Sequence, residues 1–315
     1  MVDIRNQLSG YEFTGCFVRN RNAIVFGAQN YANPDPLEPR PTQIIFHYLD
    51  AEPGNDWGYV EVDDATGLHG CLVTDPADRW VFVLDDGAVF VAGGGEADFE
   101  DDIIQTGMPF FSNVRTIPPG RAFAVGSNRK VYQRTAANRW DPLHDGLVRV
   151  EKGPKPAEFG FNDIAGLAPN EIYACGGLGD LWHYDGNGWA QIDVPTNLGL
   201  RRMCVGPDSN IYIMSDIGDL IVGRGDSWTL HVKPEEIDVQ LENLVPFGSR
   251  IILSSTDRLI AFENGEWGDA ELSPPSLSSY ARIASGDGIL LVAGIQDAAV
   301  FDGETWRVVL EPSVS

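Results

Sequence analysis

One phrase recurs four times between Asn170 and Trp306, and it decides the fold. Each copy has an apolar run, a small polar turn, a second apolar run, a turn with glycine, aspartate or asparagine, and a tryptophan. The four copies end in Gly186-Asn187-Gly188-Trp189, Gly225-Asp226-Ser227-Trp228, Asn264-Gly265-Glu266-Trp267 and Gly303-Glu304-Thr305-Trp306. Successive tryptophans are 39 residues apart. A period near 40 with several short strands in each repeat is typical of a propeller blade.

The same spacing continues toward the N-terminus. Trp57 and Trp140 also follow polar turns, and Phe99 stands midway between them as an aromatic substitute. The anchor positions are therefore seven: Trp57, Phe99, Trp140, Trp189, Trp228, Trp267 and Trp306. We predict an all-β fold, a single seven-bladed β-propeller over residues 1–315 with four antiparallel strands in each blade. The expected blades are 11–64, 65–106, 107–146, 160–195, 196–236, 237–275 and 276–312, so blade boundaries fall near the chain ends.

Apolar runs locate the strands. The second strand of most blades is almost continuously apolar, as in Trp80–Leu84, which predicts sheets covered on both faces. In the fifth blade we expect strands at 201–205, 211–214, 220–222 and 228–232. The first blade begins with an inner strand at 12–18 and the last ends with an outer strand at 306–310. No blade should therefore be shared by the two termini, apart from at most a short added strand from residues 2–8.

The anchors are expected to pack in the core, each ring against the third strand of its own blade and against the next blade. A sugar-stacking platform is the alternative role for these rings. The period and anchors resemble the seven-bladed propeller superfamily that includes WD40-type repeats. The resemblance stops at this level, because the recurring Trp-Asp dipeptide is limited to Trp140-Asp141 and neither the sialidase Asp-box nor the kelch pattern occurs. It implies a fold that hosts scaffolds, lectins, hydrolases and lyases alike.

The chain is strongly acidic. Its 46 Asp and Glu against 22 Lys and Arg give a formal net charge of −24. Such a surface repels nucleic acid and anionic membranes and favours a basic protein or peptide partner, although acidity can also serve solubility alone. No signal-peptide pattern or membrane-length apolar run is present, and four cysteines far apart in the sequence indicate reduced thiols. We therefore expect a cytoplasmic protein that is a monomer on its own.

Motifs that carry catalysis are missing from the sequence. It has no serine-nucleophile, phosphate-loop or dinucleotide-binding pattern, and its histidines lack metal-ligand spacing. We predict no catalytic residue, metal or cofactor. His69, with Asp63 and Asp64 shortly before it, is the best candidate for binding a cation or transferring a proton. A propeller hydrolase or lyase acting on a sugar or lactone is the alternative function. It would use polar residues of the inner strands in the axial channel: Glu12, His69, Arg115, Asp163, Arg201, Arg202, Glu242 and Arg282.

Two features predict partner binding. Five aspartates fall in the turns between second and third strands, where they either stabilise the turn or form an acidic rim: Asp86, Asp180, Asp219, Asp257 and Asp297. The proline-rich insertion 29–42 holds Tyr31, Leu37 and Arg40 on a stiff frame, either to bind a partner or to cap the channel, and a second insertion spans 145–161. These eight side chains are the expected partner-binding residues. The preferred function is a non-catalytic protein-interaction module, more specifically an inhibitor or immunity protein that neutralises a basic partner such as a nucleic-acid-cleaving toxin.

Overall fold

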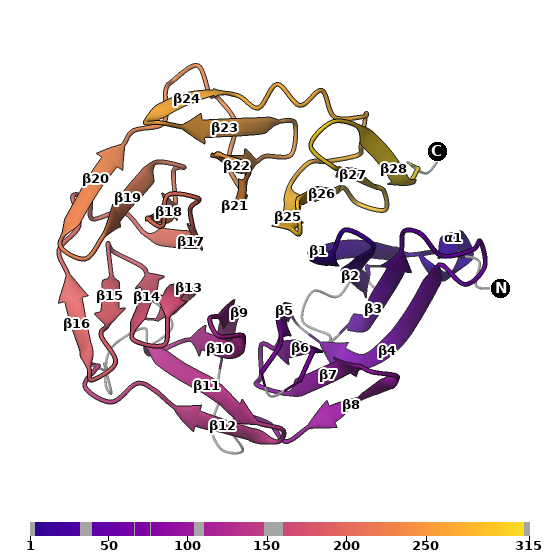
Figure 1. Ribbon diagram of the computed structural model, residues 1–315, viewed down its shortest axis with the longest axis horizontal. Helices are drawn as coiled ribbons and strands as arrows, with labels where there is room; N and C mark the ends of the chain where they lie inside the picture. Colours follow the sequence, from indigo (N-terminus) through magenta and orange to yellow (C-terminus); the bar gives the residue numbers. More distant parts are fainter. Residues whose placement is uncertain are drawn as a thin grey trace. The chain divides into compact units, whose positions relative to one another are not determined.

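A computed structural model of the chain describes residues 4–31, 40–65, 67–75, 77–103, 110–147 and 160–311. In this part of the chain the strands form seven antiparallel sheets, and each sheet takes four strands that follow one another in the sequence (Figure 1). This confirms an all-β, seven-bladed β-propeller. The contacts divide the chain into two compact units, Met1–Thr66 with Pro234–Ser315, and Gly67–Lys233. Whether residues 1–315 act as one domain stays a prediction.

The first unit contains the first, sixth and seventh sheets and one helical turn. Its first sheet consists of β1 (Tyr11–Asn20), β2 (Ala23–Asn30), β3 (Arg40–Tyr48) and β4 (Trp57–Ala65). Its sixth consists of β21 (Asn243–Phe247), β22 (Arg250–Ser254), β23 (Leu259–Glu263) and β24 (Glu266–Asp269). Its seventh consists of β25 (Arg282–Gly286), β26 (Ile289–Ala293), β27 (Ala298–Phe301) and β28 (Trp306–Leu310). The helical turn is α1 (Ile4–Gln7).

The second unit contains the second to fifth sheets. The second sheet consists of β5 (Leu68–Val73), β6 (Arg79–Leu84), β7 (Val89–Gly93) and β8 (Glu96–Glu100). The third consists of β9 (Phe111–Ile117), β10 (Arg121–Gly126), β11 (Lys130–Ala136) and β12 (Arg139–Pro142). The fourth consists of β13 (Phe161–Ala168), β14 (Glu171–Gly176), β15 (Leu181–Tyr184) and β16 (Trp189–Ile192). The fifth consists of β17 (Leu200–Val205), β18 (Ile211–Ser215), β19 (Leu220–Arg224) and β20 (Ser227–His231).

The predicted strands agree with these bounds to within a few residues. In the fifth sheet, for example, β18 was expected at 211–214 and covers Ile211–Ser215. All five residues of β18 are buried, as a sheet covered on both faces requires. The covering comes from neighbouring sheets, because one apolar cluster joins Tyr173 and Leu181 of the fourth sheet to Met203 and Ile213 of the fifth.

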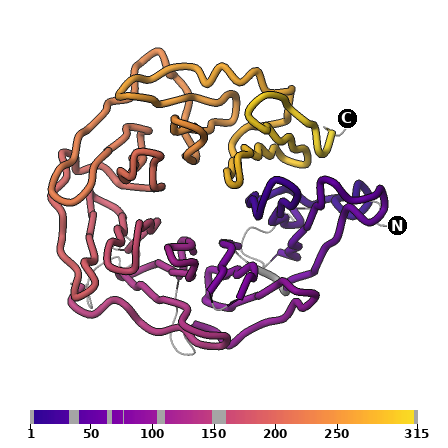
Figure 2. The backbone as a smooth tube through the Cα atoms, viewed as in Figure 1, coloured from indigo at the N-terminus to yellow at the C-terminus, as the bar shows by residue number. Residues whose placement is uncertain are grey.

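The first and seventh sheets lie side by side within the first unit, and each is complete in itself (Figure 2). One apolar cluster contains Phe13 and Phe26 of the first sheet and Leu291 of the seventh. The backbone amide of Phe13 also donates a hydrogen bond to the Ile295 carbonyl at 2.8 Å. The prediction that no blade is shared by the termini is confirmed. Where an added strand was allowed, residues 4–7 form α1 instead, and its Ile4 side chain joins the same cluster.

The anchors lie in the outer strands, and all but one are half-buried; Phe99 is 41% exposed. Their rings contact the third strand as predicted, with Trp189 5.3 Å from Tyr184 and Trp306 5.1 Å from Phe301 between ring centroids. The expected packing against the next blade is wrong. The indole N–H of Trp189 donates to the Leu143 carbonyl at 2.6 Å, and Leu143 follows the outer strand of the preceding sheet. Because the outer strand starts beside the preceding sheet, the anchor ring packs toward that sheet and not toward the next one.

Candidate functional site

The turn that joins the second and third strands of each sheet is called the central turn here. Each of the five aspartates predicted to form an acidic rim lies in a central turn, as the sequence indicates. Three of them immediately precede the third strand and are at most 7% exposed: Asp180, Asp219 and Asp297. Their backbone carbonyls close the turn, since Asp180 accepts from the Gly176 amide at 2.8 Å. The other two, Asp86 and Asp257, are exposed.

The Asp180 carboxylate is the centre of a small polar cluster. It accepts hydrogen bonds from Arg129 Nε at 2.6 Å and Arg129 Nη2 at 3.0 Å, and from the Trp182 indole at 2.9 Å. The Arg129 guanidinium in turn lies 5.3 Å from the centre of the Trp182 ring. Arg129 belongs to the central turn of the third sheet, so this ion pair ties two neighbouring turns together.

Asp219 and Asp297 also bind within the protein. Asp219 accepts from the Lys233 backbone amide at 2.8 Å, and Asp297 accepts from the Ser278 amide at 2.8 Å and its hydroxyl at 2.9 Å. Each carboxylate therefore fixes a segment that connects one sheet to the next. An acidic rim made of the five aspartates stays a prediction, with Asp86 and Asp257 as its accessible members.

The ends of the proline-rich insertion are described, whereas Leu37 lies outside the described residues. Strands β2 and β3 extend the sheet to Asn30 and back from Arg40, so the insertion is shorter than the predicted 29–42. Tyr31 is 40% exposed, and the Arg40 guanidinium carbon lies 4.1 Å above its ring centre. This stacking presents Tyr31 and Arg40 as one rigid pair.

Exposed apolar side chains at the tips of central turns are the feature that the sequence analysis missed. Leu178 is 70% exposed, Ile217 is 59% exposed and Ile295 is 43% exposed. They occupy one repeat position, 39 residues apart from Leu178 to Ile217, and each stands two residues before an aspartate of the rim. The same spacing that revealed the tryptophans could have revealed them. They were overlooked because an apolar residue in a repeat is ordinarily assigned to the core.

Within the second unit, one connecting segment holds two of these turns. The Gly179 amide donates to the Leu198 carbonyl at 2.7 Å, and the Asp216 amide donates to the Gly199 carbonyl at 2.8 Å. The fit is close, because a Cβ added at Gly179 would lie 2.5 Å from the Thr196 carbonyl oxygen. Consecutive carbonyls of one segment therefore fix the turns that carry Leu178 and Ile217.

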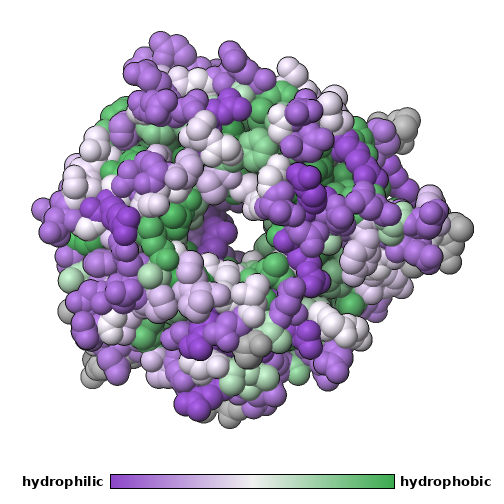
Figure 3. All heavy atoms as spheres, viewed as in Figure 1, coloured by the Kyte–Doolittle hydropathy of each residue, from purple (hydrophilic) through white to green (hydrophobic). Residues whose placement is uncertain are grey.

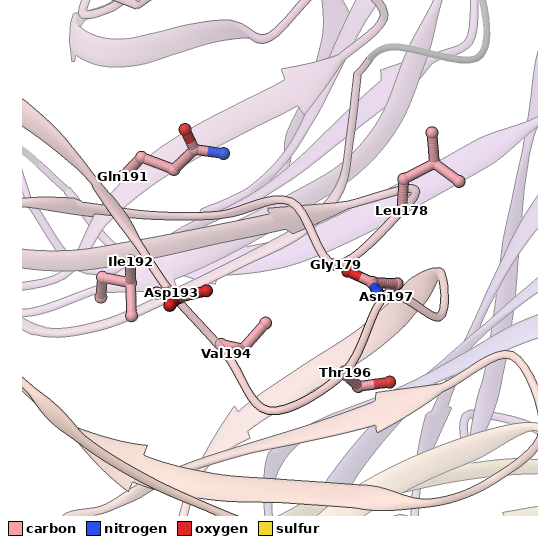
Figure 4. Close-up of a pocket in the computed structure, with 8 residues that line it drawn as sticks. All are labelled: Leu178, Gly179, Gln191, Ile192, Asp193, Val194, Thr196 and Asn197. Carbon is pink, nitrogen blue, oxygen red and sulfur yellow. The ribbon is translucent and has the colours of Figure 1, made fainter.

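A pocket of about 370 Å³ opens beside Leu178. Figure 4 shows its lining, which runs from the Leu178–Gly179 turn across Val194 to Ile192 and Asp193. Asp193 is exposed at the end of the outer strand β16. The lining is mainly polar and holds one carboxylate, which suits a polar or positively charged group, while Leu178 forms an apolar edge.

The inner strands of the second unit hold a buried ion pair. The Asp163 carboxylate is fully buried and accepts from Arg115 Nε at 2.9 Å, Arg115 Nη2 at 2.8 Å and Asn113 Nδ2 at 2.8 Å. It also accepts from the Met203 amide at 3.0 Å, so it joins three inner strands. Burial lowers the pKa of Arg115, but the Asp163 charge and hydrogen bonds outweigh it and raise that pKa overall. Burial lowers the pKa of the nearby Arg202.

His69 has a different partner from the two acids suggested by the sequence. Its Nε2 lies 3.0 Å from Asp85 Oδ1, across the pair of strands β5 and β6, and the side chains of Asp63 and Asp64 are outside the described part. Among the described residues no group of three or more His, Cys, Asp or Glu side chains is arranged to hold a metal ion. The geometry at His69 is therefore a single hydrogen-bonded pair.

The four cysteines are free thiols, and Cys16, Cys71 and Cys175 are buried. Burial raises the pKa of Cys16, Cys71 and Cys204 to about 12. Such thiols are poor nucleophiles and poor metal ligands at neutral pH, because the thiolate form is scarce.

Hydrophilic residues predominate on the face drawn in Figure 3. Within the described residues no helix is long and apolar enough to span a membrane.

No family model matches the chain. Among curated proteins it is similar to the immune protein Tsi7 of Pseudomonas aeruginosa, with 30% identity over 251 residues. The alignment covers 78% of this chain and 79% of Tsi7, so the likeness extends over most of both proteins.

Solved structures share the fold at much lower identity. Virginiamycin B lyase from Staphylococcus aureus superposes with a TM-score of 0.66 and 11% identity, over 92% of this chain and 91% of the lyase. The β-propeller domain of Cps50 (Swd1) from Myceliophteria thermophila has a TM-score of 0.66 and 9% identity, over 93% of this chain and 98% of that domain. A lyase and a propeller domain of another protein match equally well at 11% and 9% identity, so these likenesses establish the fold alone.

Proposed function

Because this chain belongs to the family of the immune protein Tsi7, we propose that it is an immunity protein that binds and neutralises a protein toxin. The sequence similarity to Tsi7 is the observation that carries the proposal, since it spans more than three quarters of both chains. The proposed action is binding without catalysis. The proposed partner is a basic protein, and the proposed location is the cytoplasm, where the free thiols of this chain stay reduced.

The charge supports a basic partner. At a formal net charge of −24 the chain attracts a positively charged protein over several ångströms and accelerates their encounter. A toxin that acts on nucleic acid carries positive charge on its surface, because lysine and arginine side chains bind the phosphates. An acidic inhibitor competes for the same basic surface, and its long-range attraction lets it bind the toxin before the toxin finds its substrate.

The polar groups of the inner strands support binding over catalysis. Arg115 and Asp163, two of the residues that an enzyme of this fold would use, form a bidentate pair with each other. The Asp163 carboxylate is fully buried, and beyond the two bonds from Arg115 it accepts from Asn113 Nδ2 and from the Met203 amide. A group satisfied in this way is a structural tie and leaves no free oxygen for a substrate.

Affinity capture followed by a rescue assay tests the proposal. The tagged chain is used to capture proteins from a lysate of its source organism at low and at high salt, and the captured proteins are identified by mass spectrometry. Each basic protein is then expressed in a sensitive host with and without this chain. We expect one captured protein to stop growth alone and to be harmless when this chain is present, with capture reduced at high salt.

Two results would overturn the proposal. One is that no captured protein is toxic. The other is that a captured toxin stays toxic in the presence of this chain although the two proteins bind. Measured turnover of the toxin or of a small molecule by the purified chain would instead favour an enzymatic function.

A further inference from the structure

Three apolar side chains of the second unit are more exposed than any other large apolar residue of the described chain. Leu178 is 70% exposed, Val232 is 64% exposed and Ile217 is 59% exposed. Each belongs to a turn or connecting segment, where polar residues ordinarily stand. Single exposed apolar residues need no explanation, but a group of them held together does.

Backbone hydrogen bonds hold the three segments together. The turns of Leu178 and Ile217 bond consecutive residues of one connecting segment, Leu198 and Gly199, at 2.7 and 2.8 Å. Next to Val232, the Lys233 amide donates to the Asp219 carboxylate at 2.8 Å, and Asp219 ends the turn of Ile217. The three apolar residues therefore stand on one continuous, rigid framework.

Leu178 adopts an unfavourable backbone conformation. Its φ is +58°, in the left-handed region where residues other than glycine are strained. The neighbouring residues are glycines, and Gly179 has a φ of +71°. Leucine at this position neither fills the core nor suits the turn. Strain of this kind is found where a side chain serves recognition.

Acidic groups flank the apolar residues. Asp216 is exposed next to Ile217, and Asp193 is exposed in the pocket beside Leu178 (Figure 4). We name Leu178, Asp193, Asp216, Ile217 and Val232 the Leu178 surface. Exposed apolar residues combined with charged residues are the composition of a protein-binding site. Its complement is an apolar projection surrounded by lysine or arginine.

We propose that the Leu178 surface is the docking site for the basic toxin. This inference rests on the proposed immunity function and adds the place of contact. The occupant is a protein that lays apolar side chains against Leu178, Ile217 and Val232 and sets basic side chains against Asp193 and Asp216. Charge complementarity with a chain of net charge −24 favours this occupant over a second copy of the same acidic protein.

Matched variants test the site. Leu178→Arg and Ile217→Arg together introduce two positive charges and remove two apolar contacts. Val308→Arg is the control, because Val308 is a 36% exposed apolar residue of the outer strand β28. Leu178→Asp separates the two effects, since it removes the apolar contact but makes the site more acidic. Wild type and variants are used side by side as baits on one lysate, and the retained basic protein is purified for calorimetry.

The expected result is specific to the surface. The double variant should bind the retained protein at least about tenfold more weakly than wild type, as the loss of hot-spot residues does. Val308→Arg should bind like wild type, and Leu178→Asp should also bind more weakly. A thermal unfolding midpoint equal to that of wild type shows that the fold of each variant is intact.

Other outcomes overturn the inference. It fails if the double variant retains every protein that wild type retains, and equally if wild type retains no protein. It also fails if wild type is a dimer by light scattering and the double variant is a monomer, because a second copy would then be the occupant. If the retained protein is lost in the double variant but is not toxic, the surface stands and the immunity function fails.

Discussion

Substitution of Asp163 by alanine should destabilise the protein by about 3 kcal/mol. The carboxylate is fully buried and bonds Arg115 twice, at 2.8 and 2.9 Å. Removal of one member of a buried ion pair costs about 3–5 kcal/mol, because the remaining charge has no partner. The lower end applies because the Arg115 side chain is 35% exposed and water can solvate part of its charge. The donors at Asn113 and the Met203 amide lose the same partner, and their cost is contained in this figure because the contacts are coupled.

Denaturant unfolding of four proteins measures this coupling. The set is wild type, Asp163→Ala, Arg115→Met and the double variant, each unfolded in urea and followed by tryptophan fluorescence. Either single change leaves one charged group of the pair without its partner, whereas the double change removes both charged groups. We therefore expect the double variant to lose less stability than the sum of the single losses, by about 1 kcal/mol or more.

Glu96→Ala is the matched control in the same unit. Its carboxylate is 85% exposed and lies 3.8 Å from Arg79, so the substitution should change stability by less than about 0.5 kcal/mol. The reasoning is refuted if Asp163→Ala costs no more than Glu96→Ala. It is also refuted if the losses at Asp163 and Arg115 simply add, because the two groups would then not compensate each other.

Three further predictions concern single groups. Burial lowers the pKa of His47 below its ordinary 6.5, so the unfolded chain takes up the proton at a higher pH than the folded chain does. The stability contributed by neutral His47 is therefore present above pH 6.5 and is lost as the pH falls toward the lower pKa of the folded state. His47→Gln should flatten that loss in unfolding midpoints measured across this range. With pKa values raised to about 12, Cys16, Cys71 and Cys204 should react with Ellman's reagent far more slowly in the native protein than after denaturation, and fast native labelling would contradict this. Leu178→Gly should leave the unfolding midpoint unchanged or raise it, because relief of about 1 kcal/mol of left-handed strain offsets the greater entropy of unfolded glycine, whereas Ile217→Gly should lower it.

The fold could be predicted because its signals are local and repeated. A tryptophan at a fixed distance after two apolar runs marks the outer strand, and the turn residues before it fix the hairpin. The direction of packing could not be predicted in this way. Trp189 turns toward Leu143, which follows the outer strand of the preceding sheet, and this depends on how the outer strand of Trp189 is placed between its neighbours. A period gives the order of the strands but not the side on which a ring finds space.

The candidate site was harder to predict because residue type and role separate at the turns. Asp180 and Asp297 have the residue type of a binding rim, yet their carboxylates bond Arg129 and Ser278 inside the protein. The carboxylate of an aspartate that directly precedes a third strand reaches the connecting segment or the neighbouring turn. The side chain two residues earlier, at the tip, reaches solvent. Whether a side chain of such a turn is buried therefore depends on its position among the four turn residues, and only weakly on whether the side chain is polar.

This geometry separates the exposed surface of a central turn from the stability of the fold. The tip position of a central turn contributes little to the core: it holds Leu178 in one sheet, Ile217 in the next and Thr256 in the sixth. The turn is held instead by the following aspartate or by backbone bonds to the connecting segment, as for Gly179 and Leu198. Exchange of one side chain for another at the tip should therefore alter the exposed surface of the turn more than it alters the stability of the fold. The position recurs every 39 residues from Leu178 to Ile295, so four consecutive sheets each offer one tip at which the surface can vary.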